Sequence, residues 1–131
     1  MKALDTNILV RLLVNDDASQ GAKAHALLLE AEQAQASFMV TTPVVLELIW
    51  VFSAVYEIGR KEIIDALENL LLLTVLEFED YDRVRKLCTL AKSDTLDLAD
   101  MLIGLSANDL DCKTTVTFDK RAAKSDLFEL L

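Results

Sequence analysis

Residues 1–17 read MKALDTNILVRLLVNDD, and this order of residues sets the predicted architecture. The letters KAL predict a short strand, and TNILVRLLV predicts a helix directly behind it, with Asp5 or Thr6 suited to cap that helix. In open α/β folds, a strand that ends in a carboxylate just before a helix delivers that side chain to a crevice at the strands' carboxyl edge. Asp5 is therefore either a helix cap or the first member of a functional site.

The rest of the chain continues this alternation of strand and helix. Further strands are predicted at SFMVT (37–41), TVLEF (74–78) and TTVTF (114–118). Further helices are predicted at about 19–35, 43–58, 60–73, 80–92, 96–110 and 120–124, with Gly59 ending the second of these and an apolar patch at 127–131 closing the chain. Such alternation predicts an α/β fold with a mainly parallel sheet that is covered on both faces.

Size and composition predict one soluble domain, spanning residues 1–131. A chain of 131 residues with 53% hydrophobic content can bury roughly two-thirds of its unfolded surface in one core. The cysteines, Cys88 and Cys112, lack the spacing of a zinc site or a disulfide framework, which fits a reducing cytoplasm. We find no export signal, and the longest apolar run, Leu70 to Leu76, is far shorter than the about 20 residues that cross a bilayer.

The charge of the chain restricts its partners. A net charge of −9 and a pI near 4.5 argue against a broad electrostatic grip on nucleic acid, which usually needs a basic face. An acidic chain suits a basic protein partner or divalent cations. The mean hydropathy of +0.30 is high for a soluble domain, so we expect another chain to cover some apolar surface in an oligomer.

Four acidic residues stand where the local pattern changes, namely Asp5, Glu47, Asp100 and Asp119. Asp5 and Asp119 each stand where a helix begins, and a capping aspartate contributes about 1 kcal/mol without any catalytic purpose. Asp97 stands in a first helical turn, where the macrodipole favours a negative side chain. Glu47 and Asp100 instead lie in apolar stretches, so we expect them to be largely buried and the helix around Glu47 to be buried on two sides.

If these acids converge, something must neutralise them. Two carboxylates about 4 Å apart repel by roughly 4 kcal/mol at an effective dielectric constant near 20. The only histidine, His25, has no second ligand at a helical spacing and is expected to be an ordinary helix residue. A hard divalent cation with oxygen ligands is the economical solution, and Mg²⁺ or Mn²⁺ fits an all-carboxylate site.

Four segments, taken together and in this order, resemble PIN-domain ribonucleases: MKALDTNILVRLLVNDD, TTPVVLELIWVF, LDLADMLIGLSA and TFDKRAAK. More narrowly, they resemble the VapC toxins of VapBC toxin–antitoxin pairs, and the similarity covers essentially the whole chain. It implies a single PIN-like nuclease domain with a three-layer α/β/α fold, in which a central, mainly parallel sheet of four to five strands is flanked by about seven helices. It also implies an acidic pocket that binds Mg²⁺ or Mn²⁺ and cuts single-stranded RNA.

The resemblance assigns roles to residues by position. Asp5, Glu47 and Asp100 correspond to the family's three principal acids, and Asp119 corresponds to the less regular fourth. Accessory positions beside these acids are Asp97, Thr6, Asn7 and Thr117. The basic residues nearest to the acids in sequence, and hence the candidates for contacting RNA phosphates, are Arg11, Lys120, Arg121 and Lys124.

The expected reaction is hydrolysis by metal-activated water, which leaves a 5′-phosphate and a 3′-hydroxyl and needs no pair of histidines. The expected partners are RNA, a second copy of the chain in a homodimer, and a basic VapB-like antitoxin. A higher assembly with the antitoxin is also open. Surplus apolar surface is expected on the helices around Leu46 to Tyr56 and Ile63 to Leu73.

Two other classes of protein remain open. One is a PIN-like module that binds RNA or protein without activity, which a metal titration followed by an RNA cleavage assay distinguishes. The other is a phosphohydrolase of the haloacid dehalogenase kind, which also begins with a strand ending in aspartate. Those enzymes usually need a second aspartate two residues later, and Asn7 occupies that place.

Overall fold

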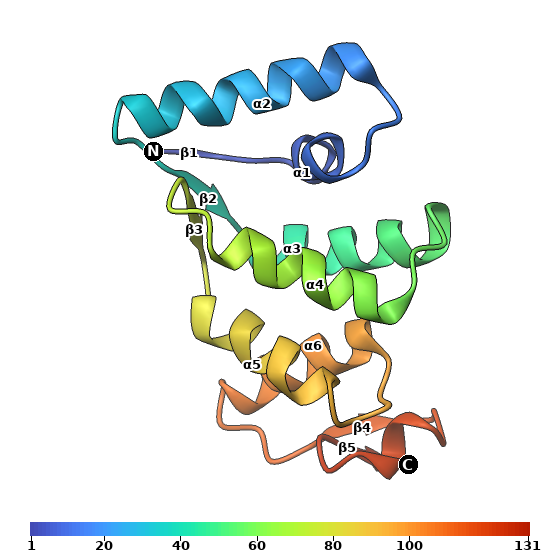
Figure 1. The fold of residues 1–131 in the computed structure, drawn as a ribbon. Coiled ribbons are helices and arrows are strands. Elements are labelled where there is room, and N and C mark those ends of the chain that lie inside the picture. Colours follow the sequence, from blue (N-terminus) through green and yellow to red (C-terminus); the bar gives the residue numbers. More distant parts are fainter. The chain divides into compact units, whose positions relative to one another are not determined.

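Strand β1 (Lys2–Ala3) leads into helix α1 (Thr6–Leu13), as the opening residues predict. A computed structural model describes all 131 residues, which form two units, Met1–Tyr81 and Asp82–Leu131. Figure 1 shows the order of the elements along the chain. Asp5 has extended backbone angles and caps α1, so the chain changes from strand to helix at this one residue.

The first unit holds a three-stranded parallel sheet in the order β1-β2-β3. Because parallel strands need crossover connections, helices join each strand to the next. Strand β1 is joined to β2 (Phe38–Val40) by α1 and α2 (Ala18–Gln33). Strand β2 is joined to β3 (Leu76–Phe78) by α3 (Thr42–Trp50), the π-helical segment η1 (Val51–Val55) and α4 (Arg60–Leu71).

Packing within this unit follows the apolar residues of its helices. Helix α1 contacts both α2 and α3, and α4 contacts β3 and η1. The side chains that are almost fully buried here come from α1, β2, α3, η1 and α4: Leu9, Val10, Val40, Val45, Leu48, Phe52, Leu67 and Leu70. The core thus fixes α1 against α3, which are the helices that carry Asp5 and Glu47.

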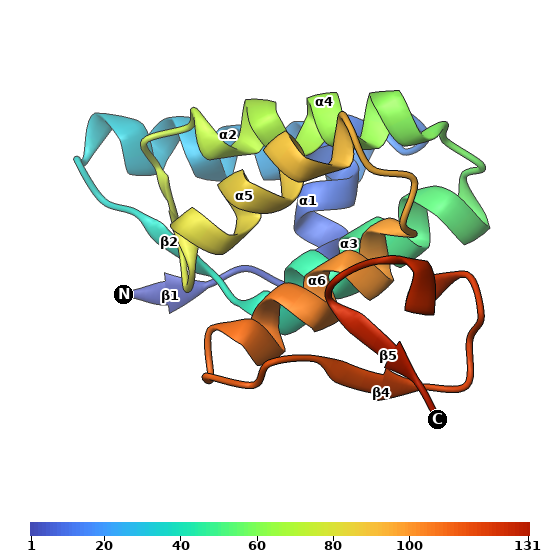
Figure 2. The ribbon, with the colours of Figure 1, turned by 90° about the horizontal axis from the view of Figure 1, so that it is seen from below.

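The second unit contains α5 (Tyr81–Ala91), α6 (Leu98–Asn108), β4 (Thr115–Thr117), the 3₁₀ turn η2 (Ala122–Lys124) and β5 (Phe128–Leu130). Strands β4 and β5 pair in parallel beside α6, as Figure 2 shows. Gly104 allows α6 to lie close to Leu127 and Phe128. A Cβ at position 104 would lie 2.9 Å from the Leu127 Cβ and 3.1 Å from the Phe128 Cε2. Arg83 of α5 donates to Asp109, which follows α6, at 2.6 Å.

The predicted α/β class with parallel strands is confirmed, but the sheet is smaller than expected. The larger sheet has three strands rather than four to five, and a second sheet has two. Six α-helices are present, and the seventh predicted helix is only the short η2. Strand β5 lies within the closing apolar patch, which had no strand prediction because three residues give too short a pattern.

The end of the helix near Gly59 was predicted wrongly. Helix α3 changes to π-helical hydrogen bonding at Val51, and the reversal that follows is made by Glu57, which has a φ of 53°. Gly59 instead has an extended backbone and begins α4. Glycine is the usual sequence signal for a left-handed residue, so a glutamate in that conformation leaves no such signal.

The expected burial of α3 on two sides was also wrong. Its buried residues are Val45, Leu48 and Ile49, which form one face, while Trp50 is 59% exposed. His25 lies exposed on α2, as an ordinary surface histidine. None of the helices combines the length and the apolar character needed to cross a membrane.

Candidate active site

Asp5 stands at the carboxyl end of β1 and begins α1. Its Oδ1 accepts a hydrogen bond from the Thr6 backbone N–H at 2.8 Å, while its Oδ2 has no partner. Thr6 is only 2% exposed, and its Oγ1 is buried without a hydrogen-bond partner. A buried hydroxyl without a partner costs about 1–3 kcal/mol, and the Thr115 Oγ1 of β4 is in the same situation. Asn7, the next accessory candidate, is exposed.

Glu47 lies in the middle of α3, in the same unit as Asp5. The structure corrects the expected burial of Glu47, because the residue is exposed. Its apolar neighbours in sequence point to the core from one face of the helix, and Glu47 lies off that face. Its carboxylate forms no ion pair or hydrogen bond within the chain and is therefore free to bind a ligand.

The second unit holds Asp97, Asp100 and Asp119 in capping and turn structures. Asp97 is the cap of α6, where its Oδ1 accepts from the Asp100 N–H at 3.1 Å, rather than a residue of the first turn. Asp119 accepts from the N–H groups of Arg121 and Ala122 at 2.8 and 3.3 Å. The capping role considered for Asp5 is thus present. Asp119 instead closes the turn before η2, because the cap residue of η2 is Arg121, and both acids leave Oδ2 unused.

Thr117 supports the turn that presents Asp119. Its Oγ1 accepts from the Asp119 N–H at 3.0 Å, so the end of β4 is tied to the turn that precedes η2. This is a concrete structural role for a residue that sequence alone marked only as an accessory candidate.

The environment of Asp100 disfavours the charge of its carboxylate. Burial, followed by the nearby charges of Asp97 and Asp119, raises the pKa of the Asp100 carboxyl above its ordinary value. The structure therefore brings these three acids near enough for their charges to interact. Asp100 is half-buried, so the expectation of a largely buried side chain is only partly met.

No cation of the chain neutralises the four main acids. None of Asp5, Glu47, Asp100 and Asp119 forms an ion pair, whereas Asp16 and Asp109 pair with arginines. Neither unit by itself contains three or more acidic, cysteine or histidine side chains placed to hold a metal ion. The donors present are nevertheless carboxylate oxygens without competing bases, which is the ligand type that Mg²⁺ and Mn²⁺ prefer.

The basic candidates for RNA binding fall into two groups. Arg11 is engaged within the first unit, where it binds Asp16 at 2.8 Å, Gln20 at 2.7 Å and the Tyr56 hydroxyl at 3.2 Å. Its guanidinium therefore has a structural role, and these contacts compete with any binding to RNA phosphates. By contrast, Lys120, Arg121 and Lys124 are exposed and form no ion pair.

The network around Arg11 was not predicted from the sequence. The Tyr56 hydroxyl donates to Asp16 Oδ2 at 2.7 Å, so the end of η1 is tied to the segment between α1 and α2. Asp16 and Tyr56 are 40 residues apart, and no local pattern marks such a pair. The hydrogen bond from Tyr56, and then the charge of Arg11, lower the pKa of Asp16 despite some desolvation.

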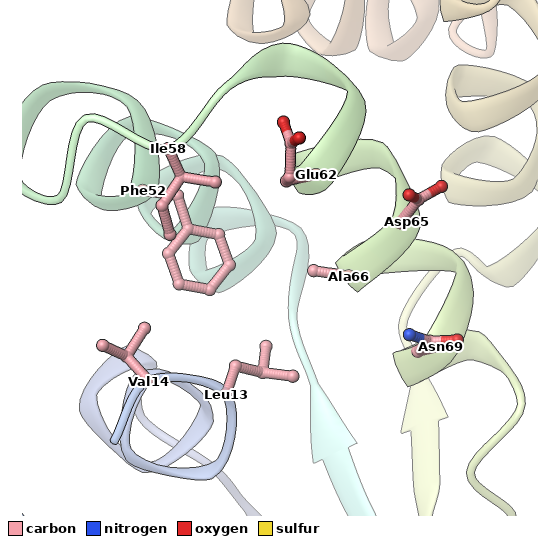
Figure 3. Close-up of a pocket in the computed structure, with 8 residues that line it drawn as sticks. All are labelled: Leu13, Val14, Phe52, Ile58, Glu62, Asp65, Ala66 and Asn69. Carbon is pink, nitrogen blue, oxygen red and sulfur yellow. The ribbon is translucent and has the colours of Figure 1, made fainter. Parts of the chain in front are cut away.

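A pocket of about 310 Å³ lies in the first unit between α1, η1 and α4. Figure 3 shows an apolar floor opposite acidic and amide side chains of α4. The floor is formed by Leu13, Val14, Phe52 and Ile58, and the α4 side contributes Glu62, Asp65, Ala66 and Asn69. An apolar floor with a carboxylate rim suits a ligand that has an aliphatic part and a positive charge.

Comparison with known families gives the family of the chain. The family model of the PIN domain matches residues 2–126, a range that includes all four main acids and spans both units. The chain belongs to the PIN domain family. This membership confirms the predicted family and the three-layer α/β/α fold class. None of the curated proteins compared with the chain gives a match.

PIN domains are generally nucleases that use divalent metals, and the chain therefore has a nuclease fold. This membership favours a nuclease over a phosphohydrolase of the haloacid dehalogenase kind. The acids that the sequence singled out lie inside the matched range, at the end of β1, in α3, in the first turn of α6 and after β4.

Proposed function

We propose that the chain is a metal-dependent endoribonuclease that hydrolyses single-stranded RNA as the VapC-type toxin of a type II toxin–antitoxin pair. The observation that carries this proposal is the combination of PIN family membership with four acids that no base neutralises. Carboxylates that serve only stability are usually paired or solvated, whereas Asp100 is held where its charge is disfavoured.

In this proposal, Asp5, Glu47, Asp100 and Asp119 hold Mg²⁺ or Mn²⁺, and Asp97 supports Asp100 through its backbone N–H. A bound ion would neutralise their charges and would acidify a water for attack on the phosphate. Thr6 and Asn7 follow Asp5 directly in the chain, and the proposal assigns to them the orientation of a water or a ligand by hydrogen bonding. Thr117 holds Asp119 in its turn.

The remaining chemistry is positioning of the RNA. Lys120, Arg121 and Lys124 bind the phosphates next to the acids, because they are the free cations nearest to Asp119 in the chain. Water rather than the ribose 2′-hydroxyl attacks, so the products carry a 5′-phosphate and a 3′-hydroxyl. An exposed His25 on α2 agrees with a reaction that needs no histidine.

The same proposal includes a basic VapB-like antitoxin and a homodimer as partners, in a cytoplasmic protein. Residues 1–81 carry 5 basic and 13 acidic side chains, a net charge of −8, and this acidity supports docking of a basic segment. The pocket with Glu62 and Asp65 on its rim offers one place for a lysine or arginine stem. The exposed Trp50 and Val55 supply apolar surface for a further contact.

The proposal is tested by incubating the purified chain with 5′-labelled single-stranded RNA in Mg²⁺, in Mn²⁺ and in EDTA. We expect cleavage only with a divalent ion, and products whose 3′-hydroxyl ends can be extended by poly(A) polymerase. Products ending in a 2′,3′-cyclic phosphate, or equal cleavage in EDTA, would contradict the mechanism.

The same assay distinguishes a nuclease from the alternative, an inactive PIN-like binding module. Such a module would bind RNA or protein and would give no cleavage in any metal. Co-purification with the product of a neighbouring gene tests the antitoxin part on its own, and recovery of a basic protein that suppresses cleavage is the expected result.

A further inference from the structure

Phe118 is the most exposed of the large apolar side chains, with 81% of its surface accessible. It follows the last residue of β4 and directly precedes Asp119, within the turn that leads to η2. A phenylalanine ring can bury well over 100 Å², so leaving it in water forgoes much of its stabilising potential. The chain itself provides nothing that covers this ring.

The turn that holds Phe118 is well defined by hydrogen bonds. The Asp119 N–H donates to Thr117 Oγ1 at 3.0 Å, and Asp119 Oδ1 in turn accepts from Arg121 N at 2.8 Å. Phe118 thus lies between two anchored residues, and its backbone is fixed although its side chain is exposed. With the backbone already ordered, only the two side-chain torsions of Phe118 remain to be fixed when a ligand stacks on the ring.

The residues that follow supply positive charge without partners. Lys120, Arg121 and Lys124 are exposed and form no ion pair. Residues 82–131 carry 8 basic and 9 acidic side chains, a net charge of −1, although the whole chain has a net charge of −9. These three cations lie in the less acidic unit and follow the exposed Phe118 within six residues of sequence.

We propose that Phe118 is a base-stacking residue that determines the specificity of the nuclease for single-stranded RNA. An unpaired base stacks on the phenyl ring, while Lys120, Arg121 and Lys124 contact the flanking phosphates. Aromatic platforms beside basic side chains bind single strands of many sequences, because every base has a π-face. Bases inside a duplex are already stacked and cannot reach such a ring, so duplex RNA is disfavoured.

This inference rests on the proposed nuclease function, because it places the base next to Asp119. A second copy of the chain is a poorer occupant of the Phe118 surface. Two copies that met through this turn would bring six unpaired cations together, and like charges at an interface disfavour association. RNA instead supplies negative phosphates for those cations.

The binding test uses the full chain with Asp100→Asn, which keeps the RNA intact, and a 12-nucleotide single strand or a hairpin duplex. Phe118→Ala is expected to raise the Kd for the single strand about 10-fold or more. Val116→Ala is the matched control, because Val116 is also exposed (56%) on β4 but has no aromatic face. It should change the Kd less than about 2-fold, and Phe118→Trp should restore binding.

Catalysis separates the failure of this inference from the failure of the function. Wild-type protein that cleaves no RNA would overturn the nuclease proposal and the stacking proposal with it. Cleavage by the wild type, with Phe118→Ala matching Val116→Ala in both KM and kcat, would overturn the stacking proposal alone. We expect Phe118→Ala to raise KM and to leave kcat nearly unchanged.

A spectroscopic readout observes the stacking itself. The chain has one tryptophan, Trp50, so the double variant Trp50→Phe, Phe118→Trp places the only indole at position 118. Single-stranded RNA should quench its fluorescence strongly, and the hairpin should not. Equal quenching by both RNAs, or dissociation of a wild-type dimer upon Phe118→Ala in light scattering, would contradict the assignment.

Discussion

Asp100 occupies a position that disfavours its own charge. Burial and the charges of Asp97 and Asp119 raise the pKa of its carboxyl, so the ionised form destabilises the protein as long as no cation is bound. Such stored destabilisation is typical of functional sites, where stability is given up for activity.

Replacement of Asp100 by asparagine therefore has opposite effects on activity and stability. Cleavage should fall more than about 100-fold, because loss of a direct ligand exceeds the effect of losing its supporting residues. The melting temperature of the metal-free protein at pH 7 should rise, because the amide carries no charge that burial and neighbours oppose. Differential scanning fluorimetry in EDTA and an RNA cleavage assay measure the two effects.

Asp126→Asn is the control, because Asp126 is exposed in the same unit. It should leave both quantities nearly unchanged. A lower melting temperature for Asp100→Asn than for the wild type would show that Asp100 has a stabilising role, and would contradict the electrostatic interpretation.

The contact between Tyr56 and Asp16 predicts a dependence of stability on pH. The pKa of Asp16 is lowered from 3.8, first by the hydrogen bond from Tyr56 and then by Arg11. A carboxyl whose pKa is lower in the folded state stabilises the fold at pH values above its unfolded pKa, and this contribution is lost as the pH falls through the folded pKa. Urea unfolding should thus show Tyr56→Phe less stable than the wild type at pH 5–7, with the difference shrinking below about pH 4.

Tyr81→Phe serves as the comparison, because Tyr81 is an exposed tyrosine with no hydrogen bond of its side chain. It should show little difference from the wild type at any pH. A Tyr56→Phe difference that stays constant down to pH 2.5 would mean that Asp16 does not contribute through its charge.

At the scale of elements, the contact of α6 with β5 depends on Gly104. A methyl group there would meet the Leu127 Cβ at 2.9 Å, a distance that requires movement of the backbone or the side chain. Overpacking of this kind costs about 1–3 kcal/mol, while alanine regains up to about 1 kcal/mol of helix propensity. Gly104→Ala should therefore lower the free energy of unfolding by about 1–2 kcal/mol in urea titrations.

Gly21 provides the comparison on another helix. A Cβ at Gly21 would lie 3.4 Å from the Arg11 carbonyl oxygen, which is an ordinary contact. Gly21→Ala should be neutral or stabilising. If Gly104→Ala also stabilised the protein, the close approach of α6 to Leu127 would be wrong.

Most strands could be predicted from the sequence, but two short elements could not. The strands at KAL, SFMVT, TVLEF and TTVTF were predicted, because each is a β-branched or apolar run that meets a helix signal at its end. Strand β5 and η1 were not predicted, because three residues are too few for a period and π-helical bonding has no distinctive composition. The exposure of Glu47 was missed because a helix of apolar residues does not show which face lies against the core.

The candidate acids could be named from the sequence, whereas their surroundings could not. Asp5, Asp100 and Asp119 lie near the starts of elements, which are visible in the sequence, whereas Glu47 lies in the middle of α3; the family match includes all four. The engagement of Arg11 with Asp16 and Tyr56, and the exposure of Phe118, depend on contacts between segments distant in sequence. Only a three-dimensional structure supplies such contacts.

At the scale of the whole molecule, charge is divided unevenly along the chain. Residues 1–81 carry a net charge of −8 and residues 82–131 a net charge of −1. The overall charge of so acidic a protein repels RNA, so the affinity for RNA must come from a few local lysine and arginine side chains.

The salt dependence of RNA binding measures the number of these cations. Three phosphate contacts to a single strand give a slope of about −2 for the logarithm of the binding constant against the logarithm of the salt concentration. We therefore expect a slope near −2 for Asp100→Asn protein, and a slope near zero after Lys120, Arg121 and Lys124 are all replaced by alanine. A slope unchanged by that replacement would place the phosphate contacts elsewhere.

The claim on which the account depends is that acids distant in sequence hold the same divalent cation. Isothermal titration of Mn²⁺ into the wild type, Asp5→Asn and Asp100→Asn tests it directly, with circular dichroism showing that each variant is folded. We predict that the wild type binds Mn²⁺ and that either single substitution removes most of this binding. Folded variants that both bind Mn²⁺ as tightly as the wild type would contradict the account.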